Sequence, residues 1–101
     1  MIKATIRDNG AGRLTIQGDL SFASVPAIWT QWQNLDGGRT GLDIDLSAVR
    51  RSDSAGLALL VACLRQTKQT GKSIWFFNIP TQMQAMARVS GLDQLLPFQR
   101  D

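Results

Sequence analysis

A chain of 101 residues with 44% hydrophobic content can bury one compact core and is too short for two ordinary domains, so we expect one domain over residues 1–101. The absence of histidine removes the commonest general base, the usual catalytic dyads and most zinc sites. The net charge of +3 is spread along the chain, and no basic run exceeds the pair Arg50-Arg51, so the concentrated basic stripe of a nucleic-acid binder is missing.

The N-terminal segment predicts a β-hairpin. Apolar and polar residues alternate over residues 2–7 and again over residues 13–17, which is typical of half-exposed strands. Residues 8–12 between them read Asp-Asn-Gly-Ala-Gly, and an Asn-Gly pair favours a tight hairpin turn. We expect residues 18–21 to leave the second strand.

A first helix is expected to open at Ser24-Val25-Pro26, because serine can cap a helix and proline is tolerated in its first turn. The glycines of residues 36–41 are expected to end it. Two interpretations fit Trp29: it fills the core together with Trp32, or it is partly exposed and serves a partner surface. The helix buries one face through residues that recur at spacings of three and four: Val25, Ile28, Trp32 and Leu35.

The centre of the chain predicts a strand–helix–strand unit. Residues 42–46 form the first strand, a helix follows from about residue 54 to 70 and ends at Gly71, and the apolar residues 73–78 form the next strand. The two strands of such a unit run parallel. We expect the near-continuous apolar run of residues 73–78 to be covered on both faces. Cys63, which lies among leucines of the helix, is predicted to be a small core residue.

A third helix is expected to start at Pro80-Thr81-Gln82 and to stop at Ser90-Gly91. Residues 92–98 then close the fold as a short apolar turn or a final helix. The third helix is expected to turn its apolar residues inward: Met83, Met86, Ala87 and Val89.

Candidate catalytic groups are few. Asp43 and Asp45 alternate with apolar residues and therefore point to one face of a strand. They fit either a metal or acid–base pair or, more simply, solvation of a strand face. The sequence provides no histidine, cysteine or glutamate beside them as a third ligand, and the loop of residues 48–56 lacks a glycine-rich phosphate cradle and its lysine. We therefore expect no catalysis, no metal and no cofactor.

The junction that leads into the second helix is the most distinctive stretch. We expect a short polar loop after residue 46 and a helix start at Ser52-Asp53-Ser54, where small polar side chains cap free amide groups. The same amide groups and the helix dipole would also accept a phosphate on Ser54. Gly56 costs about 1 kcal/mol in a helix relative to alanine, which indicates that its backbone closely approaches either a neighbouring strand or a partner.

Asp45-Leu46-Ser47-Ala48-Val49 followed by Asp53-Ser54-Ala55-Gly56-Leu57 resembles the signature of STAS domains. Val89-Ser90-Gly91-Leu92 is similar to the late Ser-Gly-Leu turn of that family, and the order of elements matches over nearly the whole chain. The resemblance implies a single α/β, SpoIIAA-like domain. Its mixed sheet would have four to five strands and an N-terminal hairpin, with about four helices packed mainly on one face.

The resemblance also implies a non-catalytic module that binds a protein partner. STAS domains include the small cytoplasmic subunit of Mla-type phospholipid-transport ABC complexes, and the run Ser54 to Leu60 is most similar to that branch. In this branch the partner is the transporter ATPase. The alternative branch is the anti-sigma factor antagonists, in which the partner is an anti-sigma factor kinase and the position of Ser54 is phosphorylated. Carried over, the partner-binding residues are Arg51, Ser52, Asp53, Ser54, Ala55, Gly56 and Leu57.

The location of the chain follows from the same features. No run of about 18 apolar residues is present, and the alternating N-terminus lacks the apolar stretch of a signal peptide, so we expect neither membrane insertion nor cleavage. The single cysteine excludes an internal disulfide and fits a reducing compartment. We therefore expect a cytoplasmic protein that reaches the inner face of the membrane only through its partner.

Overall fold

The computed structural model describes residues 4–35 and 40–99. Residues 2–3 of the predicted first strand and residues 36–39 of the predicted first helix end lie outside the described residues. The elements, in chain order, are β1 (Ala4–Asp8), β2 (Arg13–Leu20), α1 (Val25–Gln33), β3 (Gly41–Ser52), α2 (Ser54–Gln69), β4 (Ser73–Phe77), α3 (Thr81–Val89), the 3-10 helix η1 (Leu92–Gln94) and β5 (Phe98–Gln99).

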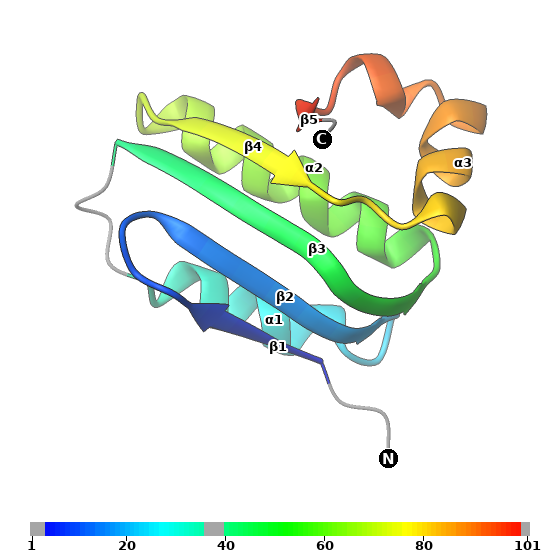
Figure 1. Cartoon of the computed structure of the whole chain (residues 1–101), viewed down its shortest axis with the longest axis horizontal. Helices are drawn as coiled ribbons and strands as arrows, with labels where there is room; N and C mark the ends of the chain where they lie inside the picture. The colour runs from blue at the N-terminus through cyan, green and yellow to red at the C-terminus, as the bar shows by residue number, and fades with distance from the viewer. Residues whose placement is uncertain (1–3, 36–39, 100–101) are drawn as a thin grey trace.

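The strands form one mixed sheet in the order β1-β2-β3-β4-β5 (Figure 1). β1 pairs antiparallel with β2, and every other neighbouring pair is parallel. The predicted N-terminal hairpin and the predicted parallel unit of β3, α2 and β4 are both confirmed. The hairpin loop is longer than a two-residue turn, because Asn9 N donates to the Arg13 carbonyl and four residues, three of them with positive φ, connect the strands.

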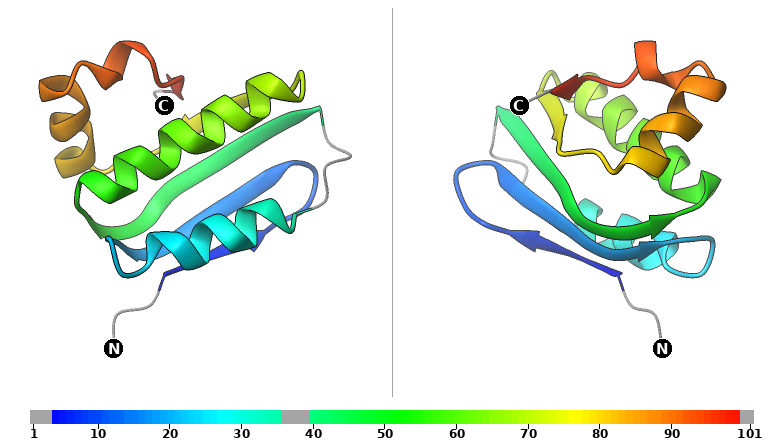
Figure 2. Two further views of the ribbon diagram at one scale, coloured as in Figure 1. Left: turned by 180° about the vertical axis from the view of Figure 1, so that it is seen from behind. Right: turned by 45° about the vertical axis from the view of Figure 1, so that its right-hand side comes forward.

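α1 and α2 lie side by side on the same face of the sheet (Figures 1 and 2), and α3 stands at one end of it. The core lies between this helical layer and the sheet, and its fully buried side chains include Leu14, Ile28, Ile44, Leu60 and Phe76. The Gln31 side chain of α1 accepts a hydrogen bond from the Ile6 amide at 3.0 Å, which fastens edge strand β1 to the helical layer. The architecture predicted from the family resemblance is confirmed.

The opposite face of the sheet carries no helix in the described part of the chain (Figure 2). The prediction that the strand of residues 73–78 is covered on both faces is therefore wrong. Ile74 and Phe76 are buried under α2, but Trp75 is 41% exposed on the open face. An unbroken apolar run has no period that would distinguish one covered face from two.

β2 and β3 are both longer than predicted. β2 continues to Leu20 instead of ending at about residue 17, and β3 continues to Ser52 in place of the predicted polar loop. The two strands stay paired up to Leu20 and Ser52, but their register shifts between Thr15 and Gln17 and again between Gly18 and Asp19. At each shift β3 has one residue more than β2, which breaks the alternation of side chains in β3. In β2 the alternation continues to Leu20, but Gly18-Asp19 is typical of a turn in sequence, so this strand was predicted to end before them.

The helix ends agree with the predictions in most places. Pro26 lies in the first turn of α1, and Gly71 and Gly91 take positive φ values of 73° and 74° where α2 and α3 end. Met83 and Ala87 of α3 are buried, whereas Val89 is 89% exposed, so its predicted inward position is wrong. Val89 is the last helical residue, beyond the stretch of α3 that packs on the core. After η1, the chain adds β5, a strand that the sequence pattern did not predict.

No helix in the described ranges is both long enough and apolar enough to cross a membrane.

Burial of Cys63 leads to a prediction about its reactivity. Cys63 lies on α2 inside the core, as predicted, and burial raises the pKa of its thiol from the ordinary 9.0 to about 12. Because the thiolate is the reactive form, we expect native protein at pH 8 to resist iodoacetamide, whereas unfolded protein reacts at once. An Ala58→Cys variant, exposed on the same helix, is the matched control and should react without unfolding.

The same pKa shift sets a pH dependence of stability. The unfolded thiol ionises above pH 9.0, but the folded thiol stays neutral to about pH 12. The contribution of Cys63 to the free energy of unfolding is therefore complete below pH 9.0 and declines as the pH rises toward 12. Rapid iodoacetamide labelling of native Cys63 at pH 8 would contradict the burial on which both predictions about Cys63 depend.

Candidate functional site

The junction of β3 and α2 is a closely bonded helix start. Asp53 is the N-cap residue of α2, in extended conformation, and its carboxylate accepts a hydrogen bond from the Ala55 amide at 2.8 Å. The Asp53 carbonyl accepts a second hydrogen bond, from the Gly56 amide at 3.0 Å. Two of the amide groups that a helix leaves without internal partners are thus already bound by Asp53. The predicted helix start at Ser54 is confirmed.

Gly56 lies where α2 touches the ends of two strands. A Cβ at this position would lie 2.0 Å from the Ser52 Oγ and 3.1 Å from the Leu20 Cβ. The Ser52 hydroxyl is buried and donates to the Asp53 carbonyl at 3.0 Å. The close approach inferred from Gly56 is therefore made to neighbouring strands of the same chain.

β2 ends beside this junction. Leu20 pairs in register with Ser52, and the Asp53 amide donates to the Leu20 carbonyl at 3.0 Å. The connection from β2 to α1 and the start of α2 therefore leave the same end of the sheet next to each other (Figures 1 and 2).

The residues predicted to bind a partner separate into two groups. Four of them are buried and build the junction: Ser52, Ala55, Gly56 and Leu57. Arg51 and Ser54 are exposed, and Asp53 is half-buried. The structure brings all seven together, but only the last three can present side chains to a partner, and we retain these three as the surface of the predicted site.

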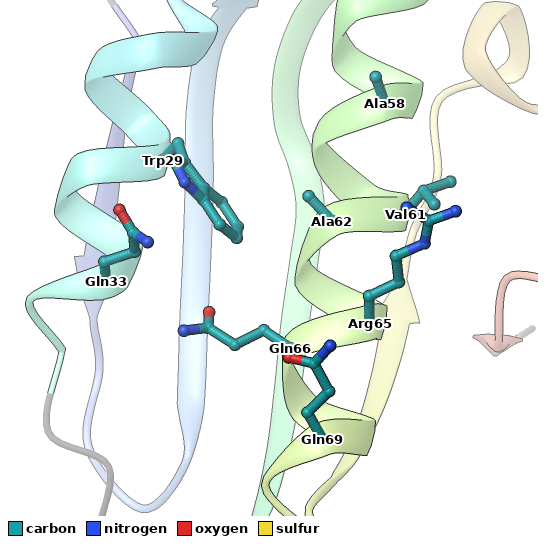
Figure 3. Close-up of a pocket in the computed structure, with 8 residues that line it drawn as sticks. All are labelled: Trp29, Gln33, Ala58, Val61, Ala62, Arg65, Gln66 and Gln69. Carbon is teal, nitrogen blue, oxygen red and sulfur yellow. The ribbon is translucent and has the colours of Figure 1, made fainter.

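A groove runs along the outside of α2 between Ala58 and Gln69 (Figure 3). It has a volume of about 650 Å³ and is walled by α1 and α2. Ala58 and Ala62, which follow Ser54 at intervals of four residues, leave space on the α2 side, and Arg65 and Gln69 extend this wall. The sequence analysis placed partner-binding residues at the start of this helix without finding the groove, although the small residues at this spacing were a signal for it.

The two tryptophans of α1 have different roles. Trp32 is buried, and its indole nitrogen donates a hydrogen bond to the Gln66 side chain of α2, which ties the two helices together. Trp29 is only partly buried and turns its ring toward α2 along the groove (Figure 3). Of the two interpretations of Trp29, the structure favours the one in which part of its ring belongs to a surface.

Asp43 and Asp45 point to one face of the strand, as predicted; it is the open face of the sheet, where they line a hollow together with Arg13 of β2. Partial burial works to raise the pKa of Asp45, but hydrogen bonds from the Ser47 amide at 2.9 Å and the Asn78 side chain at 3.1 Å outweigh it and lower the pKa. Asp45 is therefore an ionised acceptor that holds two neighbouring segments. No cluster of three or more histidine, cysteine, aspartate or glutamate side chains occurs within residues 4–35 and 40–99.

A family model described as "Mlab, STAS domain" matches residues 4–97. Curated proteins provide no significant match. Solved structures do: the anti-sigma factor antagonist SpoIIAA in its unphosphorylated form superposes with a TM-score of 0.73 at 16% identity, with 97% of this chain and 87% of the other covered. The TM-score shows that the two chains share a fold, and at this identity the likeness shows the fold alone.

Two further structures are similar. An anti-sigma factor antagonist from Mycobacterium paratuberculosis has a TM-score of 0.73 at 22% identity, with 97% of this chain and 85% of that chain covered. The Bacillus cell fate determinant SpoIIAA in its phosphorylated form has a TM-score of 0.69 at 17% identity, with coverage of 97% and 90%.

The contact at Gly56 leads to a stability prediction. Helix propensity alone would make Gly56→Ala stabilising by about 1 kcal/mol, but the added Cβ collides with Ser52. We expect urea denaturation to show a loss of roughly 1–3 kcal/mol, as is typical of overpacking. The matched control is Ser52→Ala combined with Gly56→Ala. It removes the nearest atom, so its loss should be smaller than the sum of the single variants. A stabilised Gly56→Ala protein would refute the contact.

Proposed function

Because the chain belongs to the STAS domain family, whose members are typically non-catalytic interaction modules, we propose that it is the accessory subunit that binds the cytoplasmic ATPase of an Mla-type ABC transporter. Such a complex traffics phospholipid and maintains lipid asymmetry of the outer membrane. The subunit would work in the cytoplasm and reach the inner face of the membrane through the ATPase. It would act by contact alone, with no cofactor or metal.

The groove between α1 and α2 supports this proposal. It combines the indole ring of Trp29 and two alanines, Ala58 and Ala62, with polar and charged side chains at its margin, including Arg65 and Gln69. Protein interfaces have this composition, in which an apolar centre is enclosed by a polar rim. Its α2 wall rests on the buried leucines of the same helix, so the surface is formed before a partner arrives and little ordering is needed on binding.

Ser54 offers a means of control in either branch of the family. A phosphate would add a charge of about −1.5 to −2 at the start of α2. The amides of Ala55 and Gly56 are already bound by Asp53. Asp53 directly precedes Ser54, so its carboxylate is close to any phosphate on Ser54. A phosphate on Ser54 would therefore be repelled by Asp53 instead of folding onto the helix end, and it would project toward the partner surface.

The exposed position of Ser54 also supports the alternative function, an anti-sigma factor antagonist controlled by phosphorylation of Ser54. In that case the partner would be an anti-sigma factor kinase. Both functions use the same end of the sheet, so the identity of the partner distinguishes them.

The transport proposal predicts a complex with the ATPase of an Mla-type ABC transporter from the same organism. We expect the two purified proteins to co-elute in size-exclusion chromatography, and Ala58→Arg, which places a long charged side chain in the groove, to weaken binding at least about tenfold in calorimetry. Thr5→Arg is the control, because Thr5 is exposed on edge strand β1 and should leave the affinity unchanged. Absence of binding by the wild-type protein would overturn the proposal.

The alternative predicts phosphorylation. Incubation with the cognate anti-sigma factor kinase and ATP should add one phosphate, which mass spectrometry of the digested protein should locate at Ser54. The Ser54→Ala variant should stay unmodified. Phosphate at another serine, or none with the cognate kinase, would contradict this alternative.

A further inference from the structure

Phe22 is the most exposed aromatic side chain among the large apolar residues of the described chain, at 76% of its surface. It lies in the connection from β2 to α1, at the end of the sheet where α2 begins. We propose that Phe22 is an aromatic anchor of the docking surface and inserts into an apolar pocket of the partner ATPase beside Ser54. This inference rests on the proposed function and adds a residue that lies outside the motif and outside the groove.

The backbone around Phe22 is held rigidly. Ser21 and Ser24 enclose it: the Ser24 and Val25 amides donate to the Ser21 carbonyl at 3.1 and 2.9 Å. The Ser24 hydroxyl donates to the Asp19 carbonyl at 2.6 Å and accepts from the Ser21 amide at 2.9 Å. The predicted capping role of Ser24 is thus replaced by bonds that fix this loop. A ring presented on a fixed backbone loses little conformational entropy when it is bound.

The register of β2 and β3 places the loop that carries Phe22 and the start of α2 at the same end of the sheet. Leu20 is paired with Ser52, and the two chains are joined there by the hydrogen bond from the Asp53 amide to the Leu20 carbonyl. Phe22 and Ser54 each follow these paired residues by two positions. Because Leu20 and Ser52 are neighbours across the sheet, a partner that covers Ser54 would lie at the end of the sheet from which the Phe22 loop leaves.

The charged groups at this end indicate the chemistry of the partner. Arg50 and Arg51 are exposed, whereas the two carboxylates of the same end, Asp19 and Asp53, are half-buried, and Asp53 is bound to the Ala55 amide. Phenylalanine and arginine are both enriched at protein interfaces. The matching surface is an apolar pocket of a protein with carboxylates along its rim.

Calorimetry with the purified ATPase tests the anchor. We expect Phe22→Ala to raise the dissociation constant roughly 10- to 100-fold, as loss of a buried aromatic group predicts, and Phe22→Leu to restore part of the affinity. Val89→Ala is the matched control, because Val89 is 89% exposed but lies at the end of α3. Circular dichroism melting should show that all three variants keep the wild-type stability.

A double-mutant cycle with Ser54→Asp tests the location. If one partner surface covers both residues, the effects of Phe22→Ala and Ser54→Asp should be less than additive. Wild-type binding that Phe22→Ala leaves unchanged would overturn the anchor while the proposed function stands. Equal losses from Phe22→Ala and Val89→Ala would also overturn it, and failure of the wild-type protein to bind would overturn both proposals.

Discussion

The close approach of α2 to the ends of β2 and β3 is the constraint on which the surface features depend. A helix can begin within van der Waals distance of Leu20 and Ser52 only because residue 56 has no side chain. The contact sets the height at which α2 leaves the sheet. It thereby sets where Ser54 is exposed and where the α2 wall of the groove begins. The buried Gly56 thus positions the exposed residues around the start of α2.

The two faces of α2 have different roles. Its inner face contributes Leu57, Leu60 and Leu64 to the core, and its outer face leaves Ala58 and Ala62 opposite Trp29. Large outer side chains would fill the space between the helices, so the groove exists because the outward positions carry small residues. The leucines fix the helix on the sheet, and the surface is therefore as rigid as the core beneath it.

Periodic patterns predicted most of the fold, and features without a period were missed. The stripe of α1 and the strand–helix–strand unit came directly from spacing. The end of β3 did not, because shifted pairing breaks the alternation of its side chains. The end of β2 did not, because Gly18 and Asp19 are typical turn residues although the strand continues through them. The exposure of Trp75 could not be predicted either, since it depends on which face of the sheet the helices cover.

The partner-binding site stays a prediction, and the structure shows which of its residues are exposed. A sequence motif marks all the residues of a junction, but it does not separate the buried residues that build it from the exposed ones. Ser52 is buried and Ser54 is exposed, although both belong to the same motif. Phe22 belongs to no motif and no periodic pattern, so only its exposure in the folded chain draws attention to it.

The position of Phe22 and Ser54 at one end of the sheet has a consequence for the proposed regulation. Both are fixed to the paired ends of β2 and β3, so a charge on Ser54 needs no conformational change to affect a partner that holds Phe22. A phosphate would enter the interface beside an apolar contact, where desolvation makes it most unfavourable. Recognition and control would then reside in one rigid unit, and the affinity would change through local repulsion while the fold stays the same.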